Sequence, residues 1–565
     1  MEDVLIVNLT RMGDLIQTTP VMAGLKDRYP GIRITLLVNS VFSEICKYIP
    51  HADRVFVLDI NKILQGLNRE DPVGTFRYLE DILCKINDTV YDLVINFTHS
   101  TSSAVLISLL RTKEVRGLSM DKEGFTIKRH PWIRYFFNVI PGRDYNPFHL
   151  CDIYLKAGGV TPKEQGLHLD IPPDAEQGAY NILTEGGVNS GDILVGLQLG
   201  ASAEDKRWPI ARFAELADRL VEVFGVKILL TGSAKEVHYG REFESIVTTK
   251  PLNLIGRTDL RELVALLKRC NLFISNDTGP LHIATAVGTR TINISLASVH
   301  FRETGPYGEG HYVVGAELPC SPCGFNSSCK DMVCKRVINA ANVFELSKKL
   351  LIEGDLVSIE DSAAWENIQV YKSFFEKDGF IDYMPLIKGR PLKKDLLFVH
   401  IYRQTWLKIL DREYSSIPDS TYRHFVGKLS EQYDMDSVNI ATLIEDELNV
   451  LRRLKELSDS AFSIIAIIGR EARKSSPDVE LIKKIWRGVP PLDQEIETIG
   501  YICPALKPLT TIFKYEKEEL EEEEIAVLSE KACIIYNDLG LHASMLIQFL
   551  QSLMSTFTKQ DVCVK

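Results

Sequence analysis

Hydrophobic and polar positions give the first part of the chain a regular alternation. Up to about residue 118, short runs of aliphatic residues are separated by stretches with helical spacing. Val4 to Val7 and Ile34 to Val38 are two such runs, and Asp14 to Tyr29 between them has the spacing of one helix. Continuous apolar strands separated by helices are typical of a parallel sheet covered on both faces. The pattern therefore predicts a doubly wound α/β domain.

The same alternation restarts after Pro172-Pro173, which we interpret as a linker. Strands are predicted at Ile193 to Leu199, Val226 to Leu230 and Leu272 to Ile274, with helices between them. Asp121 to Tyr154, before the linker, is aromatic and is predicted to be a loop-rich crossing segment. Two successive doubly wound units predict a ligand cleft between them.

After about Gly354 the alternation disappears and helical spacing takes over, for example in Val399 to Leu410 and Ile440 to Leu457. We find no catalytic motif there. The predicted fold class is thus α/β, with two Rossmann-like domains at 1–172 and 173–353 and a mostly α-helical domain of unassigned role at 354–565. A chain ending near Gly354 is expected to fold and to keep its affinity for nucleotide.

Length and charge narrow the function classes. A chain of 565 residues is too long for one core, and its net charge of −11 argues against a nucleic-acid partner. Met1-Glu2-Asp3 has acid where a secretory leader needs base, so a cytoplasmic location with reduced thiols is expected. The acidic run Glu516 to Glu524 is interpreted as a solvated helix face.

The first candidate motif is Arg11-Met12-Gly13-Asp14, at the turn between the first strand and the first helix. Open α/β sheets bind ligands at this edge, so the Asp14 carboxylate could accept a proton there. Asp also caps helices well, and from the tetrapeptide alone that structural role is favoured.

A second motif follows the strand that ends at Leu199. The small residues Gly200 to Ser202 let backbone N–H groups approach a phosphate, and Lys206 adds a positive charge before Trp208-Pro209. The alternative is an ordinary surface loop with its stem packed on the tryptophan.

A third motif, Ser275 to His282, also follows a strand. Gly279-Pro280 opens a helix whose first N–H groups are free, and such a helix start attracts a diphosphate. Asp277 could instead cap the helix, and a lone histidine such as His282 is more often a packed side chain. Three motifs at strand ends of two sheets are harder to explain structurally than one.

Two further groups are less specific. Glu236, in the turn Thr231 to Glu236, could hold a ribose through its hydroxyls or could simply favour the helix start. Four cysteines have the spacing of a tetrathiolate site for structural zinc or iron, and reduced loop thiols are the alternative. They are Cys320, Cys323, Cys329 and Cys334.

The order of Asn8 to Asp14, Lys206 to Pro209 and Asn276 to His282 resembles the ADP-heptose:lipopolysaccharide heptosyltransferase family over about residues 1–350. The resemblance implies the GT-B fold, a nucleotide-sugar donor held by the second domain, and inversion without a catalytic metal. It implies that Asp14 is the base. The donor-binding residues that it implies or that the motifs suggest are Gly200, Ser202, Lys206, Glu236, Asp277, Thr278, Gly279, Leu281 and His282.

This chain departs from the family at the ribose-binding glutamate, where one alignment places Ala234 and Glu236 is the nearest carboxylate. The cysteine cluster resembles one in some members, including protein-glycosylating relatives that hold iron. The region after about residue 354 resembles nothing known in the family.

The function implied is transfer of a heptose or related sugar from a nucleoside-diphosphate sugar, ADP-heptose first, to a hydroxyl acceptor such as lipopolysaccharide core. The acceptor could also be a protein or another polysaccharide, and peripheral membrane contact is a further option. A non-catalytic nucleotide-sugar-binding protein is the alternative from another class. The combination of Asp14, Lys206 and Asp277 argues against it, since a scaffold has no need of all three.

Overall fold

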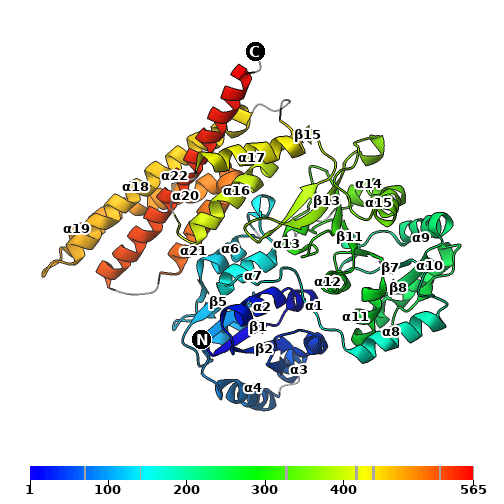
Figure 1. Cartoon of the computed structure of the whole chain (residues 1–565). Coiled ribbons are helices and arrows are strands. Elements are labelled where there is room, and N and C mark those ends of the chain that lie inside the picture. The colour runs from blue at the N-terminus through cyan, green and yellow to red at the C-terminus, as the bar shows by residue number, and fades with distance from the viewer. Residues whose placement is uncertain are drawn as a thin grey trace. The chain divides into compact units, whose positions relative to one another are not determined.

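The computed structural model describes the chain except for residues 69–70, 140, 325–328, 414–417, 436–439, 521–523 and 564–565. It consists of two compact units (Figure 1). The first joins Met1–Gly124 to Phe148–Lys388, and the second joins Phe125–Pro147 to Gly389–Lys565. Both predicted α/β sheets lie mainly in the first unit, whereas residues 125–147 of the expected 1–172 domain belong to the second.

The first sheet of this unit contains parallel strands in the order β3-β2-β1-β4-β5. Val4 in the central strand pairs with Ile34 on one side and Leu93 on the other. Its side chain is fully buried, like those of the three residues after it, which explains the continuous apolar run. The strands are β1 (Asp3–Asn8), β2 (Arg33–Asn39), β3 (Arg54–Leu58), β4 (Leu93–Asn96) and β5 (Val115–Met120).

The helices beside this sheet include one difference from the prediction. The expected single helix from Asp14 to Tyr29 is two, because Pro20 has no N–H to donate and lies in the first turn of the second helix. The helices are α1 (Met12–Ile16), α2 (Thr19–Arg28), α3 (Ile60–Asn68), α4 (Pro72–Asn87), α5 (Thr101–Ser108) and α7 (Leu150–Gly158), with a 3₁₀ helix at Ser40–Lys47.

The second sheet has the order β14-β13-β12-β11-β10-β7-β8-β9. The strands from β12 to β9 in this order are parallel, and β13 is antiparallel to both of its neighbours, β12 and β14. The strands are β7 (Leu194–Gln198), β8 (Lys227–Thr231), β9 (Leu252–Asn253), β10 (Leu272–Asn276), β11 (Thr291–Ser295), β12 (Tyr312–Ala316), β13 (Ile368–Phe375) and β14 (Ile381–Pro385).

Helices pack around this sheet as the alternation predicts. They are α8 (Pro173–Glu185), α9 (Ile210–Phe224), α10 (Val237–Ile246), α11 (Leu260–Arg269), α12 (Gly279–Ala286), α13 (Phe301–Thr304), α14 (Val333–Val337) and α15 (Ala340–Glu353), with 3₁₀ turns at Glu204–Lys206, Ala234–Glu236 and Ala363–Trp365. The core joins β-strand residues such as Ile274 to helix residues such as Phe213.

The structure moves the domain boundary expected at Gly354. The hairpin of β13 and β14 lies beyond it and extends the second sheet, with Val370 and Ile381 buried. The first unit therefore ends at Lys388. A chain cut near Gly354 would lose two strands and leave β12 as an unpaired edge, so it is not the independent unit that we expected. β13 has no strict alternation, because both of its faces are buried near its start.

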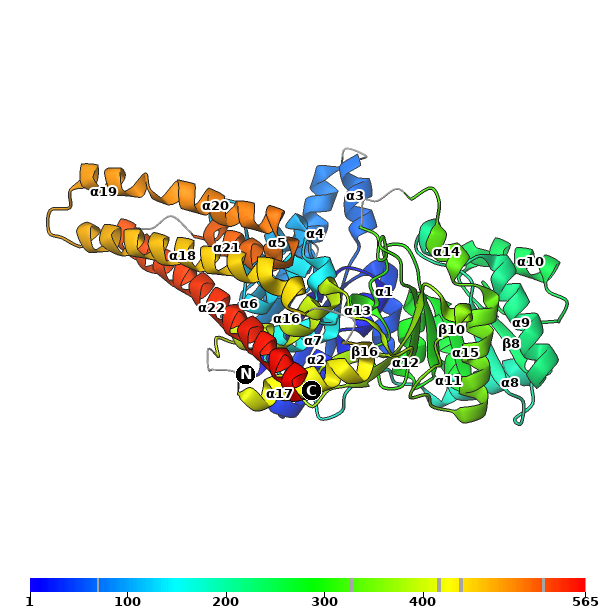
Figure 2. The same cartoon turned by 90° about the horizontal axis from the view of Figure 1, so that it is seen from above.

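The second unit is helical, as predicted, and its long helices α18 (Ile440–Ala472) and α22 (Ile525–Cys563) lie side by side (Figure 2). Its elements are α16 (Lys394–Leu410), α17 (Asp419–Gln432), α18 (Ile440–Ala472), α19 (Val479–Trp486), α20 (Val489–Ile502), α21 (Lys507–Glu518) and α22 (Ile525–Cys563), a 3₁₀ turn at Pro504–Leu506, and the short pair β15 (Arg390–Pro391) and β16 (Tyr433–Asp434). No helix in the described ranges has the length and apolar character that a membrane span requires.

A segment from the first half of the sequence is part of this helical unit. It contains β6 (Thr126–Arg129), α6 (Pro131–Val139) and a 3₁₀ turn at Arg143–Tyr145. The buried Trp132 donates its indole N–H to Asp411 at 2.7 Å, and the rings of Tyr135 and Trp406 meet edge to face with centroids 5.4 Å apart. The prediction of a loop-rich crossing segment is therefore wrong for α6, whose aromatic residues form part of a core.

The acidic run at the end of α21 is also different from its interpretation as a solvated face. The Glu519 side chain is largely enclosed, accepts a hydrogen bond from Arg134 Nε at 2.8 Å, and accepts another from the Lys128 N–H at 2.8 Å. Burial raises the pKa of Glu516 to about 7, while Arg134 opposes that shift. Residues 521–523 of the run lie outside the described residues. Part of the run is therefore structural, because Arg134 of α6 supplies the cation that pairs with Glu516 and Glu519.

Candidate functional site

The turn between β1 and α1 positions Asp14. Asn8, at the end of β1, is fully buried, and its Nδ2 donates to the Asp14 backbone oxygen at 3.1 Å. Its Oδ1 accepts the Thr10 N–H at 3.2 Å. The buried amide therefore holds both ends of the turn, so that the Asp14 side chain projects from the first turn of a helix at the carboxyl edge of the sheet.

The Asp14 carboxylate has one structural contact. Its Oδ2 accepts the backbone N–H of Arg11 at 3.1 Å, which supports the helix start from within the first turn rather than from the cap position. No hydrogen bond within the described part of the chain reaches Oδ1. Asp14 is half-buried, and its negative charge acts on the side chains of His99 and His282. One oxygen thus supports the fold, and the other has no partner among the residues that the structure describes.

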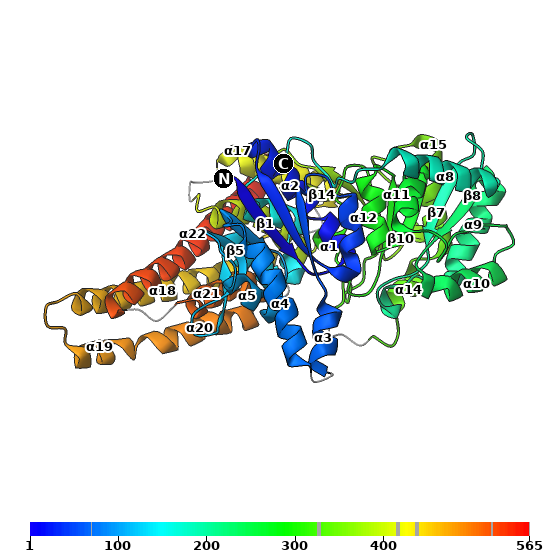
Figure 3. The same cartoon turned by 90° about the horizontal axis from the view of Figure 1, so that it is seen from below.

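Helices α1 and α12 meet through two glycines, and they lie next to each other in Figure 3. A methyl group added to Gly13 would lie 2.8 Å from His282 Cδ2. Conversely, a methyl group on Gly279 would lie 2.4 Å from Met12 Cε. Each glycine admits a side chain from the opposite helix. The structure therefore brings the first and third sequence motifs together, which their separation in the chain could not establish.

His282 is enclosed beside Asp14. Burial lowers its pKa to about 4, and the Asp14 carboxylate opposes that shift, so the imidazole is neutral near pH 7. Its Nε2 lies 3.5 Å from Gln17 Nε2. His282 Nδ1 and Gln17 Oε1 are buried and have no hydrogen-bond partner among the described residues. Unpaired buried polar atoms are costly, so this arrangement suits a polar ligand group or an ordered water.

The start of α12 presents an uncapped helix end. Thr278 is the N-cap residue, and its side chain accepts no hydrogen bond from the first turn. Asp277 directly precedes this N-cap residue, and its role stays a prediction. Leu281 is fully buried, which gives its side chain a packing role. Free N–H groups and the helix dipole make this end a suitable anion site.

The loop that carries Lys206 is held in place by buried hydrogen bonds. Trp208 is fully buried, its N–H donates to Asn276 Oδ1 at 2.9 Å, and its indole donates to the Ile338 carbonyl at 2.9 Å. Asn276 Nδ2 in turn donates to the Gly200 carbonyl at 2.9 Å. The Lys206 ammonium has no ion pair or hydrogen bond with the described residues. An anchored loop with an unpaired ammonium is suited to hold a phosphate.

Glu236 has the helix-start role that its position suggested, and ribose binding stays a prediction. Its Oε2 accepts hydrogen bonds from the N–H and hydroxyl of Ser233, at 2.7 and 2.8 Å, as the reciprocal half of a helix cap. Its Oε1 accepts from Gln198 Nε2 at 3.2 Å. A methyl group on Gly200 would overlap Oε1, at 1.5 Å, so Gly200 is needed for this approach. Ser202 is exposed beyond it.

Three polar residues that the structure brings into this region had no assigned role in the sequence. Gln17 stands three positions after Asp14, which places the two on one side of a helical turn. Gln198 and Asn276 are the last residues of their strands. Polar side chains at the ends of otherwise apolar strands are the signal that could have identified the latter two.

The four cysteines do not form the expected cluster. Cys320 and Cys329 are exposed, Cys323 is half-buried and Cys334 is buried. No group of three or more metal-ligating side chains occurs among the described residues, and residues 325–328 between these cysteines lie outside them. Cys329 Sγ instead accepts the Met332 N–H at 3.3 Å. The tetrathiolate site stays a prediction that this arrangement does not support.

Comparison with known proteins shows which family part of this chain resembles. Residues 82–331 match the model of glycosyltransferase family 9 (heptosyltransferase). Lipooligosaccharide heptosyltransferase 2 of Campylobacter jejuni is 23% identical over 350 residues, which are 60% of this chain and 96% of that protein. Lipopolysaccharide heptosyltransferase 3 of Escherichia coli K12 is 28% identical over 299 residues, 51% of this chain and 80% of that one. The resemblance inferred from the motifs is confirmed.

A solved structure gives the same fold. The family 9 glycosyltransferase of Veillonella parvula superposes with a TM-score of 0.50 at 24% identity, over 62% of this chain and 98% of that protein. This likeness supports a GT-B-like α/β fold. About three fifths of this chain thus correspond to nearly the whole length of that protein.

Proposed function

This chain is a glycosyltransferase similar to family 9, and from that premise we propose that it transfers a heptose to a hydroxyl of a lipopolysaccharide core saccharide. The proposed donor is a nucleoside-diphosphate heptose, with ADP-heptose first. One observation carries the proposal: the reciprocal packing of Gly13 on His282 and of Gly279 on Met12 joins Asp14 to the uncapped start of α12. A base and an anion site are thereby adjacent.

In the proposed reaction Asp14 is the general base. Its Oδ1, which accepts no hydrogen bond from a described residue, takes the proton of the acceptor hydroxyl as the hydroxyl oxygen forms a bond to the anomeric carbon. The bond between that carbon and the diphosphate oxygen breaks on the opposite face, so the configuration inverts. The neighbouring His282 is neutral, so it does not compete as a cation for the carboxylate.

The leaving diphosphate gains negative charge as its bond to the sugar breaks. We propose that Lys206 and the first N–H groups of α12, at Thr278 and Gly279, stabilise that charge. Asp277, just before them, would bind sugar hydroxyls. Glu236 would accept hydrogen bonds from the ribose through Oε1, since its Oε2 is used by Ser233. No metal ion is required for this charge stabilisation.

The test is a transfer assay with the purified full chain. ADP-heptose and a lipopolysaccharide acceptor that lacks the added heptose are incubated together, and the product is measured by mass spectrometry. We expect a mass increase of one heptose that depends on both substrates and is lost in Asp14→Asn. No transfer, with donor binding intact as a shift of thermal unfolding, would reject this acceptor and leave protein or another polysaccharide to be screened. No binding of any nucleoside diphosphate would reject the function.

A further inference from the structure

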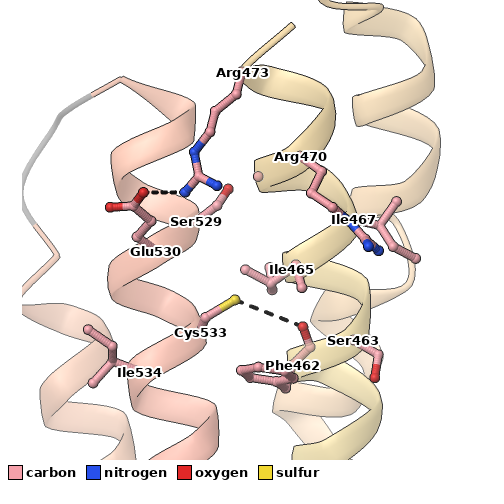
Figure 4. A pocket seen from close by; sticks show the side chains of 12 residues that line it. Phe462, Ser463, Ile465, Ile467, Arg470, Arg473, Ser529, Glu530, Cys533 and Ile534 are labelled. Carbon is pink, nitrogen blue, oxygen red and sulfur yellow. Dashed lines mark hydrogen bonds and ion pairs between the residues drawn. The ribbon is translucent and has the colours of Figure 1, made fainter.

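The helical unit has an open groove that the proposed reaction does not use. It lies between α18 and α22 and has a volume of about 700 Å³ (Figure 4). Phe462, Ile465 and Ile467 line it from α18, and Ile534 lines it from α22. Ile534 is 50% exposed and Ile467 is 43% exposed. Such large apolar side chains in one open groove mark a binding surface rather than scattered surface residues.

Two arginines, Arg470 and Arg473, also line this groove. Arg473 pairs with Glu530 across it, as Figure 4 shows. Arg470 lines the same groove, is exposed, and forms no ion pair with any described residue. One positive charge at the groove is therefore neutralised within the protein, and the other is available to an external anion.

The basic and apolar character continues from the end of α18 into α19. Six basic and three acidic residues occur between positions 470 and 487, in a chain whose net charge is −11. Lys484 and Arg487 are exposed and form no ion pairs with described residues. Val479, Leu481 and Trp486 are exposed beside them. Figures 1 and 2 both show α19 next to the end of α18.

We propose that this end of the helical unit docks on an anionic membrane surface, with a lipid acyl chain in the α18–α22 groove and lipid phosphate near Arg470. Exposed aliphatic and tryptophan side chains enter the interfacial layer, while lysine and arginine remain at the level of the headgroups. Unpaired cations are attracted to anionic lipid. In a symmetric dimer the same cations would face their own copies and repel them, whereas anionic lipid is complementary to them.

Binding to vesicles tests this surface without donor or acceptor. The full chain is mixed with phosphatidylcholine vesicles that either contain or lack phosphatidylglycerol, and bound protein is measured by flotation. Trp486 provides a local readout, since it is 46% exposed and the other four tryptophans are at most 6% exposed. We expect binding to the anionic vesicles, with a blue shift of tryptophan emission that disappears in Trp486→Phe.

Matched substitutions separate this surface from general charge or hydrophobicity. Arg470→Gln combined with Lys484→Gln should weaken partitioning roughly 30-fold, from about 1 kcal/mol for each cation. Arg452→Gln, on the same helix and ~27 Å away at 1.5 Å per residue, should have little effect. Ile534→Ser should weaken binding, whereas Ile502→Ser, at an isoleucine that is 70% exposed at the far end of α20, should not.

Two results would overturn the proposal. One is equal or absent binding to both kinds of vesicle by a folded chain. The other is a concentration-dependent dimer in sedimentation that Ile534→Ser dissociates, which would assign the groove to a second copy. Neither result bears on sugar transfer, and failed transfer would leave the vesicle result intact.

Discussion

One polar group in each unit shows two different kinds of pairing. In the first unit, His282 Nδ1 and Gln17 Oε1 are buried without hydrogen-bond partners among the described residues, beside a carboxylate with one oxygen that accepts no hydrogen bond from them. In the second unit, Lys517 instead donates to Tyr536 at 2.9 Å and pairs with Asp493, so its charge is satisfied internally. Buried polar groups are normally paired, and a place that leaves several unpaired is prepared for a ligand.

The second unit also has buried polar atoms without a hydrogen-bond partner among the described residues, such as Trp406 Nε1, so it is the Asp14 carboxylate beside the unpaired atoms that favours the first unit for the chemistry. Charge alone is a poor guide to function. The acidic run at the end of α21 has more carboxylates than the region around Asp14, but Glu519 there is committed to Arg134 and the Lys128 N–H. The predictions below test the assignment, beginning with the largest expected effect.

Asp14→Asn should remove most of the catalytic activity of the first unit while leaving it folded. Asparagine can still accept the Arg11 N–H, so thermal unfolding should be nearly unchanged. Turnover should fall on the order of 10²–10⁴-fold, which is the usual contribution of a general base. Asp81→Asn, at an exposed carboxylate on α4, is the control. Near-normal turnover of Asp14→Asn with saturating substrates would reduce Asp14 to its helix-start role.

Trp132→Ala should destabilise the second unit without changing sugar transfer by the folded protein. The substitution leaves a cavity in a core and leaves Asp411 without its indole donor, so unfolding should be easier by about 3–5 kcal/mol. Trp486→Ala, at an exposed tryptophan, is the stability control. Turnover for each folded molecule should be unchanged below the unfolding transition. A loss of turnover in the folded state would mean that the two units share catalytic work.

Lys206→Ala should sharpen the distinction between binding and base catalysis. Removal of a charge-assisted contact to the diphosphate should raise the Kd of the donor roughly 10–100-fold, and turnover should fall as well. Calorimetric titration with nucleoside diphosphate measures the first effect. Lys235→Ala, at an exposed lysine of the Glu236 turn, is the matched control. Unchanged donor affinity in Lys206→Ala would place the diphosphate elsewhere.

Glu516→Gln tests whether ionisation of the Glu516 carboxyl destabilises the folded second unit. Because burial raises the pKa of Glu516 to about 7, its proton is retained by the folded state between pH 4.5 and 7. The free energy of unfolding should therefore fall as pH rises through that window, by up to about 3 kcal/mol from this group. Glu516→Gln should remove that part of the fall. Glu518→Gln, at a half-exposed neighbour, should retain it.

Much of the first unit could be predicted from sequence because its signals are local. A strand buried on both faces needs a continuous apolar run, as in Val4 to Val7, and a ligand-binding turn needs small or polar residues directly after such a strand. Asp14, Lys206 and Asp277 follow from this rule. The same locality explains the failure at β13 and β14, whose place in the sheet depends on pairing with β12 rather than on a clear alternation of their own.

The sequence by itself determined the alternation of strands and helices that forms the two α/β sheets, the helical character of the last third, and the three motifs that carry the proposed chemistry. Only the tertiary structure decided that α6 belongs to the helical unit, because contacts such as Trp132 with Asp411 join residues far apart in the chain. It also decided that Gly13 lies against His282. Local spacing fixes which residues share a turn or a strand end, whereas packing between distant segments decides which of these meet.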